Sequence, residues 1–139
     1  MMKLVVDTNT VISGFLWRNA PRLIIDAAMQ GRIQLATSTV LIDELATVIA
    51  RRKFSRKIAE QGVSASALLE RYAKLAELIT PAQIRRTVPG DAADDHVLAC
   101  ALAAQADWIV SGDRHLLNLK HYQGIHIIDA AEAVRSLAQ

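Results

Sequence analysis

Short apolar runs, separated by stretches with helical spacing, set the strongest limit on how this chain folds. Residues 4–6 are Leu-Val-Val, and comparable runs occupy 33–36, 108–111 and 125–128. Runs this short suit strands that are buried on both faces of a parallel sheet. Strands that alternate with helices are joined by crossovers, so the sequence predicts a single-domain, three-layer α/β/α fold with a mostly parallel central sheet. A further strand is predicted at 84–88.

Capping residues and apolar spacing locate most of the predicted helices. Pro21 suits the first turn of a helix that stops at Gly31. Ser38 is a good N-cap for a second helix, and Asp91 opens an alanine-rich helix that reaches about residue 104. Further helical segments are predicted around 116–117 and over 129–137.

Three other local predictions rest on weaker sequence patterns. Thr8 or Asn9 is expected to cap a short helix that follows the first strand. A helix capped by Ser64 or Ser66 has apolar residues on one face over 68–79, and it should end before a proline at 81. The stretch 54–62 is the most loop-like part of the sequence.

Length and composition bound the class of protein. The chain has 139 residues, of which 52% are hydrophobic, so it suits one domain spanning 1–139 with a sizeable core. Cys100 is the only cysteine, which excludes an intrachain disulfide. No apolar run reaches the roughly 18 residues of a membrane span, and the strand-like run at 4–6 starts too early to follow a signal peptide. We therefore expect a soluble cytoplasmic protein.

Acidic residues gather where the predicted fold brings strand ends and helix starts together. Six of the 14 Asp and Glu residues take such places, namely Asp7, Glu44, Asp91, Asp94, Asp95 and Asp113. The rest of the chain then carries a clear excess of its 16 Lys and Arg residues. Parallel α/β sheets bind ligands beyond the carboxyl ends of their strands, and hard cations such as Mg²⁺ or Mn²⁺ need several carboxylates. An acidic site surrounded by a basic surface is typical of a metal-dependent enzyme that acts on a phosphate polymer.

Most of these acids also have an ordinary structural explanation. Asp91 is a good N-cap, and Asp94 three residues later is favoured by the helix dipole. Glu44, in an amphipathic helix, would by itself be a solvated residue. Asp7 is harder to explain, because a charge that ends a buried strand is costly without a partner or a metal. Asp94 and Asp95 differ by about 100° around a helix, so both cannot face the same site.

A basic segment follows the helix that carries Glu44, and it consists of Arg51, Arg52, Lys53, Arg56 and Lys57. If that helix continues, Arg51 lies on the order of 10 Å along its axis from Glu44. Guanidinium groups at that distance would reach phosphates of a bound RNA. The alternative is a solvated helix end, where cations favour the dipole, or a surface that contacts a protein partner.

Four stretches of the sequence, in order, resemble the motifs of the PIN domain family, and in particular of its bacterial toxin-like nucleases. They are VVDTNTV at 5–11, TSTVLIDEL at 37–45, DAADDHVLA at 91–99 and IVSGDRHLL at 109–117. The resemblance covers nearly the whole chain and implies a PIN-like fold. It also implies a metal-dependent ribonuclease that uses Mg²⁺ or Mn²⁺, forms a homodimer and is inhibited by a small protein antitoxin.

Carried over onto this chain, the resemblance implies that an acidic quartet is both catalytic and metal-binding, namely Asp7, Glu44, Asp94 and Asp113. Asn9 and Ser111 would support the quartet through hydrogen bonds, with Asp95 and Asp91 as second choices for the metal. His115 stands where many relatives have another aspartate. The four histidines, His96, His115, His121 and His126, lack the spacing of zinc ligands, and we interpret them as structural or surface residues.

Two other functions compete with this interpretation. The segment from Asp7 to Val11 faintly resembles the motif of haloacid-dehalogenase phosphatases, in which the first aspartate is the nucleophile. That motif has a second aspartate where this chain has Asn9, which weakens the likeness. The third hypothesis is a non-catalytic module that binds an antitoxin or another subunit.

Overall fold

Strand β1 (Lys3–Val6) lies in the middle of the sheet, with parallel neighbours on both sides. The computed structural model describes residues 1–88 and 91–138. The other strands are β2 (Gln34–Thr37), β3 (Glu77–Leu78), β4 (Trp108–Val110), β5 (His121–Tyr122) and β6 (Ile125–Ile128). Their order across the sheet is β3-β2-β1-β4-β6-β5, and the β5–β6 pair alone is antiparallel among the described residues. The mostly parallel sheet predicted from the apolar runs is confirmed.

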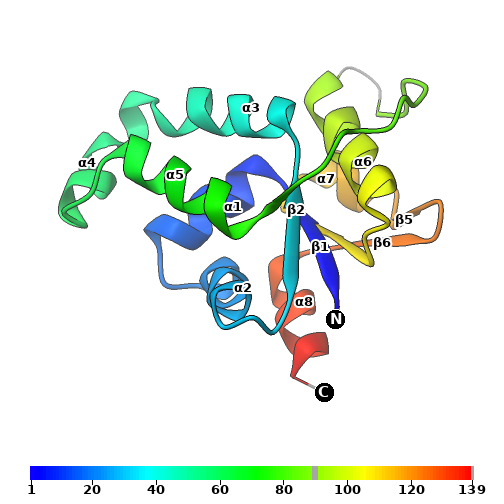
Figure 1. Ribbon diagram of the computed structural model, residues 1–139, viewed down its shortest axis with the longest axis horizontal. Coiled ribbons are helices and arrows are strands. Elements are labelled where there is room, and N and C mark those ends of the chain that lie inside the picture. Colours follow the sequence, from blue (N-terminus) through cyan, green and yellow to red (C-terminus); the bar gives the residue numbers. More distant parts are fainter. Residues whose placement is uncertain (89–90, 139) are drawn as a thin grey trace.

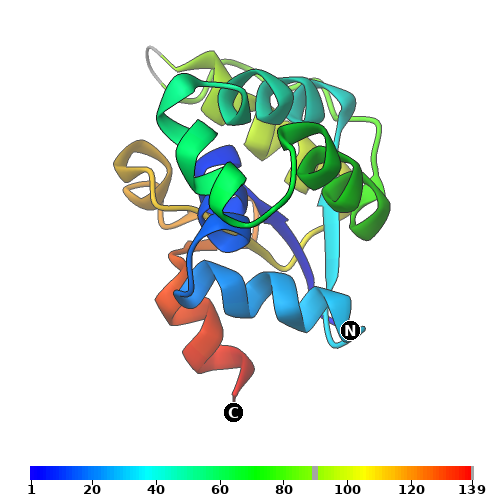
Figure 2. The same cartoon turned by 90° about the vertical axis from the view of Figure 1, so that its left-hand side faces the viewer.

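Helices cover both faces of this sheet (Figure 1). They are α1 (Thr8–Leu16), α2 (Ala20–Met29), α3 (Thr39–Ile49), α4 (Arg52–Glu60), α5 (Ala65–Leu75), α6 (Ala92–Ala104), α7 (Arg114–Leu117) and α8 (Ala130–Leu137). Figure 1 shows α6 and α7 on one side of the central strands and α1, α2, α3 and α5 on the other. Figure 2 shows α2 beside α8, whose buried alanines share one core with it. No helix in the described ranges is long and apolar enough to cross a membrane.

Alternation along the strands divides the core in two. In β1, Leu4 and Val6 pack into the cluster with α1 and α2, whereas Val5 packs against α6. In β4, Val110 likewise packs into the cluster with α1 and α2, whereas Ile109 packs on the side of α6. Successive side chains of a strand point to opposite faces, so short runs that are apolar throughout require helices on both sides.

Most predicted caps are confirmed, but the first one was misplaced. Ser38 accepts a hydrogen bond from the Leu41 backbone, and Ser64 caps α5 in the same way. For α1 the cap is Asp7 rather than Thr8 or Asn9, because Asp7 already has an extended backbone and accepts from Thr10. The first acid of the chain therefore has a structural role as well as a place in the candidate site.

The strand predicted at 84–88 is wrong. In this segment the backbone N–H groups of Thr87 and Val88 donate to the Asp95 carboxylate rather than to a neighbouring strand. A side chain thus supplies the acceptors that a sheet would have provided. The strand at this part of the chain is instead β3, where Ile79 N donates to Thr37 O at 2.8 Å. The helix predicted over 68–79 accordingly ends at Leu75.

The loop predicted at 54–62 is also wrong, since most of it belongs to α4. Phe54 and Ile58 are buried one helical turn apart, while the residues between them are mostly exposed. This i, i+4 spacing is the signal of an amphipathic helix. Arg51 has an extended backbone and separates α3 from α4. The predicted distance along one continuous helix from Glu44 to Arg51 therefore does not apply.

Candidate metal centre

Asp7 lies where β1 ends, and β4 supplies its partner. The parallel register pairs Val6 with Val110, so the next residues, Asp7 and Ser111, are neighbours at the carboxyl edge of the sheet. The Ser111 hydroxyl donates to Asp7 Oδ2, and the Thr10 backbone donates to Asp7 Oδ1 at 3.0 Å. Both oxygens of this buried carboxylate are therefore hydrogen-bonded.

Ser111 also positions the acid that follows it. Its hydroxyl oxygen accepts a hydrogen bond from the Asp113 backbone at 2.9 Å, while its hydrogen points to Asp7. Asp113 in turn caps α7 by accepting from the His115 backbone at 2.7 Å. One fully buried serine thus links two of the predicted site acids.

Glu44 reaches the same edge from α3. Its Oε2 accepts a hydrogen bond from the Thr8 hydroxyl at 2.7 Å. Thr8 is buried in the first turn of α1, directly after Asp7. A contact between two helices therefore holds the glutamate in place, and Glu44 is not the freely solvated residue that an isolated helix would present.

Asp91 and Asp94 both come from the start of α6. Asp91 Oδ1 accepts from the backbone of Ala93 at 3.1 Å and of Asp94 at 3.3 Å, so its predicted role as an N-cap is confirmed. Asp94 is 6% exposed. Its Oδ2 is buried and has no hydrogen-bond partner among the described residues. A buried carboxylate oxygen without a partner is unusual and calls for a counter-charge.

Asp95 points elsewhere, as the angle between adjacent helical residues requires. Its carboxylate accepts from the backbone of Val88 at 2.8 Å and of Thr87 at 3.1 Å. Its Oδ2 also lies 2.9 Å from Nε of Arg86. Asp95 therefore fixes the segment that precedes α6, whereas Asp94 faces the acidic pocket.

This pocket brings the four acids of the predicted quartet together. It has a volume of about 210 Å³ and is lined by Asp7, Thr8, Asn9, Glu44, Asp91, Ala93, Asp94, Val97 and Asp113. A larger recess of about 550 Å³ adjoins it and shares Asp7, Asn9 and Asp113. The acids therefore lie beside a recess that is large enough for a longer substrate.

Burial and nearby negative charge raise the pKa values of two carboxyls in this pocket, those of Asp94 and Asp7. Desolvation raises the pKa of Asp94 to about 8, and the neighbouring charges of Asp113 and Asp91 add to the rise. Burial also raises the pKa of Asp7, although hydrogen bonds from Ser111 and Thr10 oppose that shift. A divalent cation would offset both the desolvation and the repulsion, so this donor set fits a metal ion.

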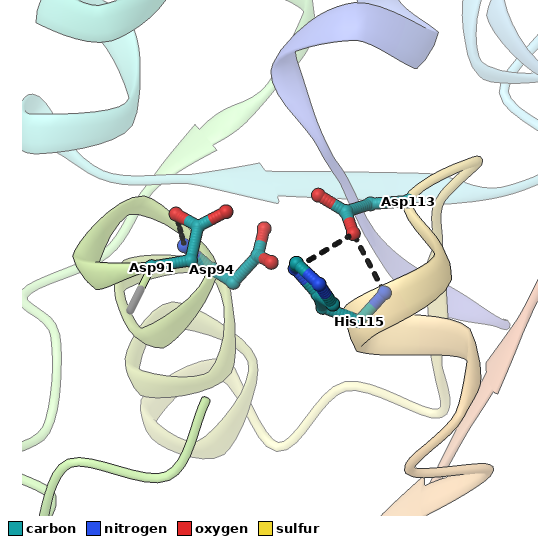
Figure 3. Close-up of side chains that lie close together, drawn as sticks. All are labelled: Asp91, Asp94, Asp113 and His115. Atoms are coloured by element: carbon teal, nitrogen blue, oxygen red, sulfur yellow. Dashed lines mark hydrogen bonds and ion pairs between the residues drawn. The ribbon is translucent and has the colours of Figure 1, made fainter. Parts of the chain in front are cut away.

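A tighter group within the site includes a residue that the sequence did not identify. Asp91, Asp94, Asp113 and His115 each offer a ligand atom, and these atoms lie within 4.8 Å of one another (Figure 3). The sequence alone favours a structural or surface role for His115 and ranks Asp91 behind the quartet. The available signal was the resemblance, in which His115 stands where many relatives have another aspartate, two residues after Asp113.

The other predicted residues form no hydrogen bond or ion pair with the quartet among the described residues. Asn9 is exposed and lines the pocket, but its side chain forms no hydrogen bond with the quartet among the described residues. The basic segment 51–57 lies at and after the start of α4 and does not line the acidic pocket. Its predicted contact with RNA remains a prediction.

The motifs that gather at this edge also match a known family. Residues 3–115 match a protein-family model described as PIN domain. No curated protein matches the chain significantly.

The raised pKa of Asp94 predicts how the stability of the metal-free protein changes with pH. An aspartate in the unfolded chain ionises near pH 4, whereas folded Asp94 has a pKa of about 8. Between these values the folded state binds the extra proton, so the free energy of unfolding should fall as pH rises, by at most about 1.4 kcal/mol per pH unit for this group. Asp94→Asn should remove that part of the fall.

Urea unfolding in EDTA at several pH values between about 5 and 8 measures this difference. Asp43→Asn is the matched control, because Asp43 is an exposed aspartate on α3. The control should keep the wild-type dependence on pH. Parallel profiles for the wild type and Asp94→Asn would contradict the electrostatic description of the pocket.

Proposed function

The chain belongs to the PIN domain family, and on that premise we propose that it is a divalent-metal-dependent endoribonuclease, the toxin component of a toxin–antitoxin system. The observation that carries the proposal is the buried, unpartnered Oδ2 of Asp94 beside Asp91 and Asp113. Asp7 and Glu44 complete the wall of the same pocket. Burying these carboxylates without a cation costs free energy, and their arrangement suits the nuclease fold of the family.

We propose that Asp7, Glu44, Asp94 and Asp113 hold one or two Mg²⁺ or Mn²⁺ ions, with Asp91 beside them. When bound, such an ion supplies Lewis acidity that activates water and offsets negative charge on the phosphodiester. The protein supplies orientation. The Ser111 hydroxyl holds Asp7 and Asp113 in one arrangement, and the Thr8 hydroxyl holds Glu44. Rigid carboxylates favour catalysis because they need not reorganise as charge develops.

The hydrogen bonds of Asp7 also separate this proposal from the phosphatase hypothesis. Asp7 Oδ1 caps α1, and Oδ2 accepts from Ser111. An aspartate that attacks phosphorus needs an oxygen directed at the substrate, and here both oxygens are engaged by the protein. An oxygen that accepts one hydrogen bond keeps a second lone pair, so this fixed carboxylate can still bind a cation, and the arrangement supports a role for Asp7 as an anchor and ligand.

We propose that the basic segment 51–57 contacts phosphates of the RNA. Arg56 and Lys57 pair with Glu60 at 3.6 and 3.8 Å. No ion pair of Arg51 or Arg52 occurs among the described residues, and both side chains are exposed. These two arginines are therefore better placed than Arg56 and Lys57 to bind an external anion.

A small protein antitoxin and a homodimer are further parts of the proposal, and they rest on the resemblance to bacterial toxin-like nucleases. Sedimentation velocity distinguishes a homodimer from the 15.2 kDa monomer.

The first prediction of the proposed function separates Asp94 from Asp95. Asp94→Asn, like Asp7→Asn, should lower Mn²⁺-dependent RNA cleavage by at least about 100-fold with the fold intact, because each removes a charge from the metal centre. Asp95→Asn should instead lower stability by about 1–3 kcal/mol, since it weakens buried hydrogen bonds to a charged acceptor. Its metal affinity should remain near that of the wild type.

Single-turnover cleavage of one RNA under saturating Mn²⁺, with urea unfolding of the same variants, measures both effects. Asp95→Asn serves as the matched control for Asp94→Asn, because the two aspartates are adjacent and equally buried. Full activity in Asp7→Asn and Asp94→Asn would refute the assignment. Greater damage to cleavage from Asp95→Asn would show that the neighbouring aspartate carries the role.

The second prediction concerns the basic segment. Arg51→Ala combined with Arg52→Ala should weaken RNA binding and flatten its dependence on salt, by about 0.7 in the log–log slope for each phosphate that the protein no longer neutralises. Metal affinity should barely change, because neither arginine lines the acidic pocket.

RNA titrations at several salt concentrations test this prediction. Arg71→Ala with Arg135→Ala is the control, because it removes the same charge from exposed positions on α5 and α8. Equal slopes for both double variants would exclude 51–57 from the RNA path and favour a surface that binds a protein partner.

A further inference from the structure

His115 is oriented toward the acids although packing does not require it. Its side chain is 63% exposed, so it is not a core residue. Its backbone donates to Asp113 Oδ1, and its ring Nδ1 lies 3.8 Å from that same oxygen. Figure 3 shows the imidazole lying between the carboxylates of Asp94 and Asp113. The start of α7 thus directs an imidazole at the start of α6.

The distances suit a shared cation. Ligand atoms of Asp91, Asp94, Asp113 and His115 all lie within 4.8 Å of one another. Two ligands on opposite sides of one ion, each at about 2.1 Å, are about 4.2 Å apart. Small side-chain rotations therefore bring all four atoms onto one ion. The buried Asp94 Oδ2, which has no hydrogen-bond partner among the described residues, is a second observation that points to a cation at this position.

We propose that His115 is a nitrogen ligand of the metal centre and that it makes the centre favour transition-metal dications such as Mn²⁺ over Mg²⁺. The inference rests on the proposed metal-dependent function and adds a selectivity that four carboxylates would not give. Mg²⁺ is a hard cation that prefers oxygen and gives up its water reluctantly. First-row transition metals accept imidazole, with an affinity that rises from Mn²⁺ towards Cu²⁺, whereas Mg²⁺ takes oxygen ligands. Replacing one oxygen ligand by nitrogen therefore costs Mg²⁺ more than Mn²⁺.

The competing explanation is that His115 is a protonated partner of Asp113. In that case the imidazolium would repel an incoming dication, and removal of His115 would tighten metal binding or leave it unchanged. The two explanations thus predict opposite effects of one substitution on the affinity for Mn²⁺.

Pulsed electron paramagnetic resonance of the 139-residue chain, loaded with one Mn²⁺, gives a readout that does not depend on activity. The wild type should show hyperfine coupling to a directly bound ¹⁴N, and His115→Ala should lose it. His96→Ala is the matched control, because His96 is exposed on α6 and lies outside the cluster. The control should keep the coupling.

Calorimetric titrations with Mn²⁺ and Mg²⁺ complete the test. His115→Ala should raise the Kd for Mn²⁺ by about 10-fold or more and the Kd for Mg²⁺ by less than about 3-fold. His115→Asp should bring the two Kd values closer together than in the wild type. Mn²⁺ binding without ¹⁴N coupling, or tighter Mn²⁺ binding by His115→Ala, would overturn the inference and leave the proposed function intact. Wild type that binds neither ion would overturn both.

Discussion

The hydrogen bond from Ser111 to Asp7 joins the two central strands at the edge where the acids gather. It exists because β1 and β4 pair in a parallel register that places Val6 beside Val110. The same hydroxyl oxygen accepts from the backbone of Asp113. The β1–β4 register therefore sets how close Asp7 and Asp113 lie, because a shift of one residue would separate Ser111 from Asp7.

Around that anchor the fold concentrates negative charge in a partly buried pocket. Capping satisfies one oxygen each of Asp91 and Asp113, and Thr8 binds Glu44. Asp94 is left with a buried oxygen that no described group approaches as a donor. Without a cation, a proton on Asp94 relieves both its desolvation and the repulsion from Asp113 and Asp91, and this is why the pKa of Asp94 is raised to about 8. A metal ion and a proton therefore compete for the Asp94 carboxylate.

The sequence predicted the parts of this arrangement that depend on local signals. Asp91 before an alanine-rich segment identified both the start of α6 and its cap, and the alternation of strands and helices placed Asp7 and Asp113 at one edge. Long-range partners were not predictable in this way. The acceptors that Asp95 offers to the segment before α6 make the strand predicted at 84–88 unnecessary. The proximity of His115 to Asp94 likewise depends on how α6 and α7 meet.

Calorimetric titration with Mn²⁺ in two buffers of different ionisation enthalpy tests the central claim most directly, because it counts the protons that the ion displaces. Since folded Asp94 is largely protonated at pH 7, Mn²⁺ binding at that pH should release roughly one proton per ion, and the release should fade above about pH 9. In Asp94→Asn the release at pH 7 should fall by roughly one proton per ion. Mn²⁺ binding at pH 7 without proton release, or with the same release in that variant, would contradict the account.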